Sequence, residues 1–135
     1  MNKMKIDHIG YLVKNIGKAK SVFCALGFQP VSEVCRDEYR DVDICFLEKD
    51  GYTIELVSPF SDDSVVADLI KKVKNMPYHI CYEVSDLSSG IADLRKEGFV
   101  PIGEPAPAPA FGMRRVCFLQ SARIGMIELL ESGKE

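Results

Sequence analysis

The sequence predicts an α+β protein made of two tandem β-α-β-β-β modules. Four segments of the first half recur in the second half in the same order, displaced by 71 to 73 residues, and such self-similarity indicates a duplicated module. In both halves, segments with the two-residue alternation of strands surround one segment with helical spacing. The recurring pairs are Ile6–Val13 with Pro77–Val84, Leu26–Phe28 with Glu97–Phe99, Ile44–Leu47 with Val116–Leu119, and Ile54–Val57 with Ile127–Leu130.

The first module is expected over about residues 5–58. Its helix follows the first strand, with Asn15 as the expected N-cap and Gly27 as the residue that ends it. Asp50-Gly51 is a hairpin signal between its last two strands. The apolar stripe of the helix consists of Ile16, Ala19, Val22, Phe23 and Leu26. The strands are expected at about 6–13, 28–37, 41–49 and 51–58.

The second module is expected over about residues 76–131, after a connecting helix at about 61–75. Asp86 is the expected N-cap of its helix and Gly98 ends it. The proline-rich segment 105–112 is expected to be an extended loop, since proline cannot donate to a strand ladder, and an active-site flap could lie there. The strands are expected at about 78–84, 99–104, 114–120 and 124–131.

Length and composition predict one domain spanning residues 1–135. With 47% hydrophobic and 27% charged residues the chain is globular, and its net charge of −3 argues against a nucleic-acid partner. No apolar segment is long enough to span a membrane, and residues 1–8 contain no apolar core typical of a secretory signal. The five cysteines are an odd number without a C-x-x-C pair, which predicts a reducing, cytoplasmic location.

Two histidines and two glutamates occupy equivalent positions in the two modules. His8 and His79 lie in the first strands, and Glu55 and Glu128 lie in the last. Because successive side chains of a strand point to opposite faces, all four are expected on the face opposite the helices. A carboxylate embedded in an apolar segment is costly unless something pairs with it, and no lysine or arginine occupies a matching position. A divalent cation would neutralise both glutamates.

In either half alone, these residues are also typical of ordinary structure, because short motifs have low specificity. Their coincidence at four equivalent positions favours a metal site. Two imidazoles and two carboxylates suit Ni, Co, Zn, Mn or Fe(II), and the pattern leaves the identity of the metal open. Two further positions of an octahedral ion would accept water or a bidentate substrate.

Cysteines and arginines near these strands are candidates to line the same site. Alternation predicts Cys45, Cys81 and Cys117 on the face of the proposed ligands. Arg114 and Arg115 follow the proline-rich segment, and one of them is expected to face the site, where it would bind an anionic thioester carrier or a carboxylate.

The pattern resembles the vicinal-oxygen-chelate superfamily, which includes glyoxalase I, methylmalonyl-CoA epimerase, extradiol dioxygenases and bleomycin-resistance proteins. The resemblance covers about residues 5–131. It implies that the two modules form one half-open eight-stranded barrel around a metal, and that the protein is a homodimer. The segments that carry it are Ile6–Gly10, Ile54–Leu56, Tyr78–Val84 and Ile127–Leu130. The ligand positions that it implies are His8, Glu55, His79 and Glu128.

The resemblance implies a metal-dependent isomerase or lyase that removes a proton α to a carbonyl, as in methylmalonyl-CoA epimerase or glyoxalase I. Glu128 is then the candidate general base, and the small-molecule substrate is a thioester or a hemithioacetal. Epimerases usually carry a catalytic acid in a Glu-x-Gly-Val segment, where this chain has Tyr39 to Val42. The nearest glutamate is Glu38, which would substitute only if a bulge or register shift re-aims it.

Two other functions remain open at this point. One is an Fe(II) ring-cleaving dioxygenase, which uses two histidines and one carboxylate, and a fourth ligand at Glu55 argues against it. The other is a non-enzymatic protein of the same fold that sequesters a drug or another small molecule.

Overall fold

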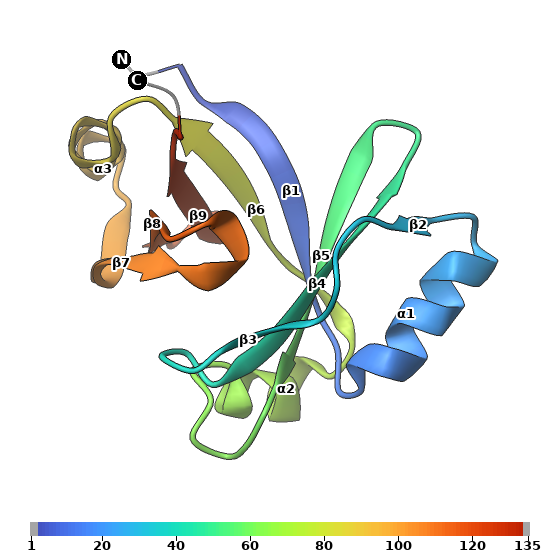
Figure 1. Cartoon of the computed structure of the whole chain (residues 1–135). Helices are drawn as coiled ribbons and strands as arrows, with labels where there is room; N and C mark the ends of the chain where they lie inside the picture. Colours follow the sequence, from blue (N-terminus) through green and yellow to red (C-terminus); the bar gives the residue numbers. More distant parts are fainter. Residues whose placement is uncertain (1–2, 134–135) are drawn as a thin grey trace. The chain divides into compact units, whose positions relative to one another are not determined.

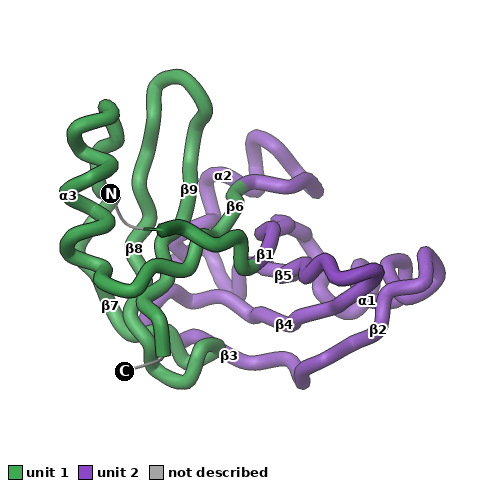
Figure 2. The backbone as a smooth tube through the Cα atoms, turned by 90° about the horizontal axis from the view of Figure 1, so that it is seen from above, with its two compact units in different colours: residues 1–7, 79–135 green, residues 8–78 purple. Residues whose placement is uncertain are grey.

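The computed structural model describes residues 3–133 (Figure 1). Within this range the chain forms nine strands, three α-helices and one 3-10 turn, so the predicted α+β class is confirmed. The chain divides into two compact units, and Figure 2 shows unit 1 in green and unit 2 in purple. Unit 2 is residues 8–78, and the described part of unit 1 is residues 3–7 and 79–133. Residues 1, 2, 134 and 135 of the predicted domain lie outside the described residues.

Unit 2 contains the helix and the last strands of the first module. The end of β1 pairs in parallel with β5, which pairs antiparallel with β4. Both β2 and β3 pair antiparallel with β4. The elements are β1 (Lys5–Leu12, from His8 onward), α1 (Ile16–Ala25), β2 (Gln29–Pro30), β3 (Cys35–Asp37), β4 (Val42–Lys49), β5 (Tyr52–Pro59) and α2 (Ala67–Val73).

Unit 1 repeats this order, with one strand after its helix where unit 2 has the two short strands β2 and β3. In it β6 pairs in parallel with β9, and β9 with β8 and β8 with β7 pair antiparallel. The matching order in the two units confirms the duplication that the sequence predicts. The elements are β6 (Met76–Val84, from His79 onward), α3 (Leu87–Lys96), β7 (Val100–Ala108), the 3-10 turn η1 (Pro109–Phe111), β8 (Arg114–Ser121) and β9 (Gly125–Glu131).

Three predicted boundaries are wrong. The single strand expected at 28–37 is two short strands, β2 and β3, which gives nine strands in the described chain instead of eight. The break follows Pro30, which lacks the N–H that a ladder requires. The connecting helix is confined to 67–73, because residues 61–66 form turns closed by Ser64 N to Ser61 O and Ala67 N to Ser64 O.

The proline-rich segment is also different from the prediction. Residues 105–108 are not a loop but the end of β7, which continues to Ala108. The pairing of β7 with β8 shifts register between Ile102 and Ala106. Proline is tolerated there because β7 is the last strand of its unit and pairs on one side with β8. Only Pro109–Phe111 leaves the strand, as a 3-10 turn that ends at Gly112 with a positive φ of 64°.

The two helices begin as predicted. The Asn15 side chain accepts a hydrogen bond from Lys18 N at 2.9 Å, and the Asp86 side chain accepts one from Ser89 N at 3.0 Å. Each helix covers the apolar face of its own sheet, which we call the helix face. Val22 and Leu26 of the expected stripe are 62% and 61% exposed. The helix-face core of unit 2 contains Val13, Cys45, Leu47, Ile54 and Leu56, and that of unit 1 contains Val84, Leu87, Leu94, Cys117, Leu119, Ile127 and Leu129.

Within residues 3–133, none of the helices has the length and apolar character that crossing a membrane would require.

Candidate metal centre

Strand register places one histidine and one glutamate on the same face of each sheet. In unit 2, Gly10 of β1 lies opposite Glu55 of β5, and His8 is two residues before Gly10. The neighbouring residues of Glu55, Ile54 and Leu56, belong to the helix-face core. His8 and Glu55 therefore point to the opposite face, which we call the His/Glu face.

His8 and Glu55 are in contact inside unit 2. The distance between His8 Nε2 and Glu55 Oε1 is 3.2 Å. His8 is 1% exposed and Glu55 is 4% exposed. The Phe46 ring lies edge-on to the His8 ring at 5.8 Å, and Phe46 is opposite Glu55 in the β4–β5 register. The imidazole is thus enclosed by an aromatic ring and a carboxylate.

Unit 1 contains the same arrangement. Here His79 Nε2 lies 3.0 Å from Glu128 Oε1, and the two residues are 4% and 3% exposed. Cys81 is opposite Glu128 in the β6–β9 register, which places His79 and Glu128 on one face, the His/Glu face of unit 1. The Phe118 ring lies edge-on to His79 at 5.2 Å and is opposite Glu128.

The two phenylalanines are functional candidates that the sequence reasoning did not single out. Phe46 and Phe118 lie inside a recurring segment of the two modules, Ile44–Leu47 and Val116–Leu119. That recurrence could have identified them. Phenylalanine occupies the same position in both halves, on the strand before the glutamate strand, which indicates that it has the same neighbour in each half. In the structure each ring makes an edge-on contact with one histidine.

The chemistry and spacing of these donors fit a metal ion. Two donors at about 2.1 Å from one ion lie about 3.0–3.4 Å apart in octahedral or tetrahedral coordination, and both observed N–O distances are in that range. Buried carboxylates and imidazoles are expensive to desolvate without a charged or hydrogen-bonding partner. These buried His and Glu side chains could therefore hold a metal ion.

Glu38 lies outside the strands that form the His/Glu face. It is an exposed residue of the turn between β3 and β4. The carboxylate on that side of the sheet belongs to the preceding residue, Asp37, which is 1% exposed and opposite Val42 of β4. Asp37 was not singled out from the sequence, where alternation shows only that it shares a face with Cys35.

Arg114 and Arg115 point to opposite faces of the unit 1 sheet. Arg114 lies on the His/Glu face, where its Nη1 is 3.1 Å from Glu83 Oε2. Arg115 lies on the helix face and its Nη2 is 2.9 Å from Glu131 Oε1. That guanidinium lowers the pKa of Glu131 by a side-chain hydrogen bond. Of the two arginines, Arg114 is the one on the side of His79 and Glu128.

The three buried cysteines do not share one face. Cys81 lies on the His/Glu face of unit 1, in a cluster with Ala108, Val116 and Leu130. The prediction is wrong for Cys45 and Cys117, which belong to the helix-face cores. The reason is hairpin register, since Cys45 lies opposite Leu56 and Cys117 lies opposite Leu129.

Comparison with known proteins shows the same relationship in sequence and in structure. The chain is 27% identical to mitochondrial methylmalonyl-CoA epimerase of Mus musculus over 128 residues, which is 93% of this chain and 71% of the relative. A crystal structure of a hypothetical protein from Bacillus halodurans has 28% identity and a TM-score of 0.86, covering 98% of this chain and 97% of that one. Methylmalonyl-CoA epimerase from Mycobacterium tuberculosis has 25% identity and a TM-score of 0.81, covering 96% of this chain and 89% of that one.

These likenesses agree with the fold class and with homology to methylmalonyl-CoA epimerases. The family model described as Glyoxalase/Bleomycin resistance protein/Dioxygenase superfamily matches residues 7–118. This match covers most of the chain, including three of the four buried His and Glu residues. The chain belongs to the Glyoxalase/Bleomycin resistance protein/Dioxygenase superfamily.

Proposed function

We propose that this protein is a divalent-metal-dependent enzyme that removes a proton from the carbon next to a carbonyl, of the methylmalonyl-CoA epimerase or glyoxalase I type. The observation that carries the proposal is the buried His–Glu contact that occurs once in each unit, at 3.2 Å and 3.0 Å. Homology to methylmalonyl-CoA epimerases supports the same class of chemistry.

In this proposal His8, Glu55, His79 and Glu128 together hold one ion. Their nitrogen and oxygen donors suit Ni, Co, Zn, Mn or Fe(II). When bound, such an ion supplies Lewis-acid stabilisation of the negative charge that develops on the carbonyl oxygen. Phe46 and Phe118 hold the imidazoles of His8 and His79 in orientation through edge-on ring contacts.

Glu128 is the proposed general base. Its side chain is 4% exposed and lies opposite Phe118 in the β8–β9 register, so the carboxylate that would receive the substrate proton is shielded from bulk water. In an epimerase a second residue must return a proton to the opposite side of the carbon. Glu38 is the candidate for that role, and its exposed side chain in the β3–β4 turn would have to move toward the substrate.

The proposed substrate is a thioester or a hemithioacetal that carries an anionic group. Arg114 is the proposed binding residue in unit 1, because it lies on the His/Glu face. Arg115 contacts Glu131 on the other face, and its proposed contribution is to hold β8 against β9.

Metal analysis and isotope exchange test this function together. The protein is stripped with a chelator and refilled with each candidate metal, and deuterium uptake from solvent is followed on a methylmalonyl thioester and on a methylglyoxal hemithioacetal. We expect one equivalent of metal and exchange into one substrate. Glu128→Gln should retain much of the metal and lose exchange by at least about 100-fold, as expected for loss of a general base.

Glu131→Gln is the matched control for Glu128→Gln. Both residues lie on β9, and Glu131 contacts Arg115 on the helix face, so this variant should exchange at the wild-type rate. Absence of stoichiometric metal after refilling, or wild-type exchange in Glu128→Gln, would contradict the proposal.

We also propose that the protein is a cytoplasmic homodimer. The five cysteines all lie within residues 3–133 and none of them forms a disulfide, which is compatible with a reducing compartment. Helix α1 exposes Val22, its C-cap Leu26 is exposed too, and none of the residues of α1 is buried, so this end of the helix offers apolar surface to a second copy. Sedimentation equilibrium across a concentration series measures the oligomeric state, and a monomer at all concentrations would exclude the dimer.

A further inference from the structure

Unit 2 contains a second buried carboxylate on the His/Glu face. Asp37 of β3 lies opposite Val42 of β4, and Val42 is four residues before Phe46, the neighbour of Glu55. An even number of residues separates the two positions, so they share a face. At about 3.3 Å per residue, Asp37 lies about 13 Å along the strand from the level of Glu55. It is 1% exposed.

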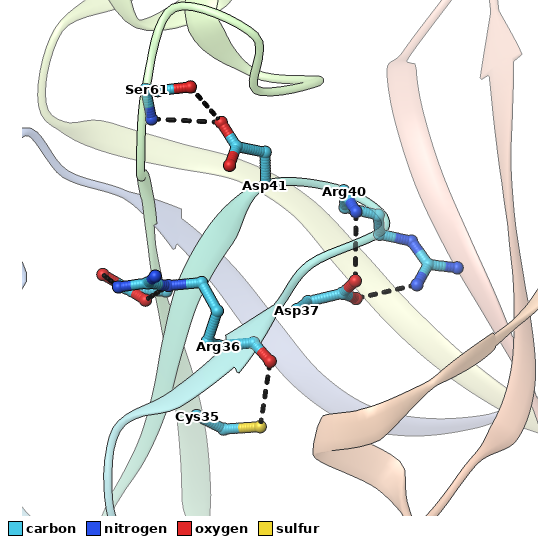
Figure 3. Close-up of polar contacts among 7 residues, drawn as sticks. Cys35, Arg36, Asp37, Arg40, Asp41 and Ser61 are labelled. Carbon is cyan, nitrogen blue, oxygen red and sulfur yellow. Dashed lines mark hydrogen bonds and ion pairs between the residues drawn. The ribbon is translucent and has the colours of Figure 1, made fainter.

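Arg40 forms an ion pair with this carboxylate. Its Nη1 donates to Asp37 Oδ2 at 2.8 Å, and its backbone N donates to Asp37 Oδ1 at 3.0 Å. The Arg40 side chain is 12% exposed. The contact with Asp37 therefore brings the guanidinium to the His/Glu face, and Figure 3 shows both side chains on the same side of the strand.

The turn that carries Arg40 is fixed to the segment that follows β5. Phe60 N donates to Asp41 O at 2.9 Å, and Val65 N donates to Arg40 O at 3.1 Å. The Asp41 carboxylate also accepts hydrogen bonds from Ser61 N and Oγ at 3.1 Å and 2.5 Å. A guanidinium on such a fixed turn is pre-organised, which lowers the entropy cost of binding an anion.

Arg36, four residues earlier, provides a contrast. It forms an ion pair with Asp43 on the other side of the strand, and its guanidinium carbon lies 3.5 Å from the centroid of the Phe60 ring. Its side chain is 40% exposed, so it is an ordinary surface arginine. Asp37 and Arg40 are different because burying an ion pair costs desolvation that its attraction often does not repay. A functional requirement for the positive charge of Arg40 on the His/Glu face would account for this buried ion pair.

We infer that Arg40 binds an anionic group of the substrate and that Asp37 is a positioning residue which holds its guanidinium. This inference rests on the proposed function and adds a specificity determinant to it in unit 2. The anionic group recognised is a carboxylate next to the reacting carbonyl or a phosphate of the thioester carrier, since a guanidinium binds both by the same forked hydrogen bonds.

Three probes separate the two sources in equilibrium binding measurements with the metal-loaded protein. Methylmalonyl-CoA carries the carboxylate and the phosphates. Propionyl-CoA lacks the carboxylate, and the methylmalonyl thioester of N-acetylcysteamine lacks the phosphates. We expect Arg40→Gln to weaken methylmalonyl-CoA binding by about 10- to 100-fold, the size expected for a hydrogen bond to a charged group.

The probes for which Arg40→Gln loses affinity identify the anionic group that Arg40 binds. If Arg40 binds the carboxylate, Arg40→Gln binds propionyl-CoA as the wild type does. If it binds a phosphate, the N-acetylcysteamine thioester is unaffected. Arg40→Lys, which keeps the charge without the fork, should show an intermediate loss, and Asp37→Asn should lose affinity for the same probes as Arg40→Gln. Arg36→Gln is the matched control and should bind all three probes normally.

Several results would overturn the inference. They are a change of less than twofold in Arg40→Gln for every probe, an equal loss for all three probes, or a wild type that binds none of them. Arg40-dependent binding without deuterium exchange on any substrate would instead retain the inference and reject the proposed function.

Discussion

Burial raises the pKa values of the Cys45 and Cys117 thiols above the ordinary value for cysteine. Desolvation is the largest cause in both cases, since Cys45 is 0% exposed and Cys117 is 2% exposed. A thiolate would be unfavourable in either helix-face core. These two residues therefore act as small apolar side chains, whereas Cys24 on α1 is exposed and is available to thiol reagents.

The raised thiol pKa predicts a loss of stability at alkaline pH. Below the ordinary thiol pKa of about 8.5, both the folded and the unfolded chain keep these protons, and the groups contribute no pH dependence. As the pH rises above that value, the unfolded thiols ionise while the folded ones stay protonated, so the free energy of unfolding decreases.

Urea unfolding from pH 7 to pH 10 measures this effect. Cys45→Val replaces the thiol with a side chain of similar size that cannot ionise, and it should show a shallower decrease above pH 8.5. Cys24→Ser, at an exposed position, is the control. An identical slope in Cys45→Val and in the wild type would show that Cys45 does not contribute.

At the scale of single elements, the β3–β4 turn depends on an aspartate with left-handed backbone geometry. Asp41 has a φ of +57°, a conformation that glycine adopts freely and that costs most other residues free energy. Its carboxylate offsets this cost by accepting hydrogen bonds from Ser61. The turn and the segment after β5 should therefore be stabilised as one structure.

Two substitutions at Asp41 separate these contributions. Asp41→Ala loses the Ser61 hydrogen bonds and puts a less suitable side chain at a positive φ, and we expect it to cost about 2 kcal/mol. Asp41→Gly loses the same hydrogen bonds without backbone strain, so it should cost less. Denaturant unfolding provides the comparison, and a glycine variant that is less stable than the alanine variant would contradict the role of backbone geometry.

The N-caps of α1 and α3 provide a second test at this scale. Asn15→Ala and Asp86→Ala each remove the side-chain acceptor of one backbone N–H, and each should lower the free energy of unfolding by about 1 kcal/mol. Lys18→Ala is a control for Asn15→Ala, because Lys18 donates through its backbone. A change of less than about 0.3 kcal/mol in both cap variants, a third of the effect of a typical cap, would contradict the assignment.

For the whole molecule, the proposed ion links folding to metal binding. A metal that binds the folded chain alone stabilises it by about 2.7 kcal/mol at a free concentration 100 times the dissociation constant. In a protein of this size that corresponds to a rise in melting temperature of about 10 °C. Calorimetry with each candidate metal measures the shift, and a chelator should reverse it.

Variants connect this shift to the proposed ligands. The double variant His8→Ala/His79→Ala removes one nitrogen donor from each unit and should abolish the metal-dependent rise, while Glu131→Gln should keep it. Retention of the full rise in the double variant would show that the stabilising metal binds elsewhere.

Local patterns were sufficient to predict the repeated element order, the two helix caps and the face of His8, Glu55, His79 and Glu128. Each of these depends on the spacing of residues within one strand or one helix turn. The face of Cys45 and of Cys117 could not be obtained in this way, since it depends on which residue of the next strand lies opposite. A register difference of one residue inverts the face of the whole strand.

The order and spacing of side chains were enough to predict the duplication and the types of residue available for a metal. Which carboxylates are buried, and what they contact, depends on strand pairing in the folded chain. Asp37 became a buried partner of Arg40, and Glu38 an exposed turn residue, through the pairing of β3 with β4. Alternation predicts that only one of Arg114 and Arg115 faces the site, and the pairing of β8 with β9 decided that it is Arg114, since register depends on residues that are distant in the chain.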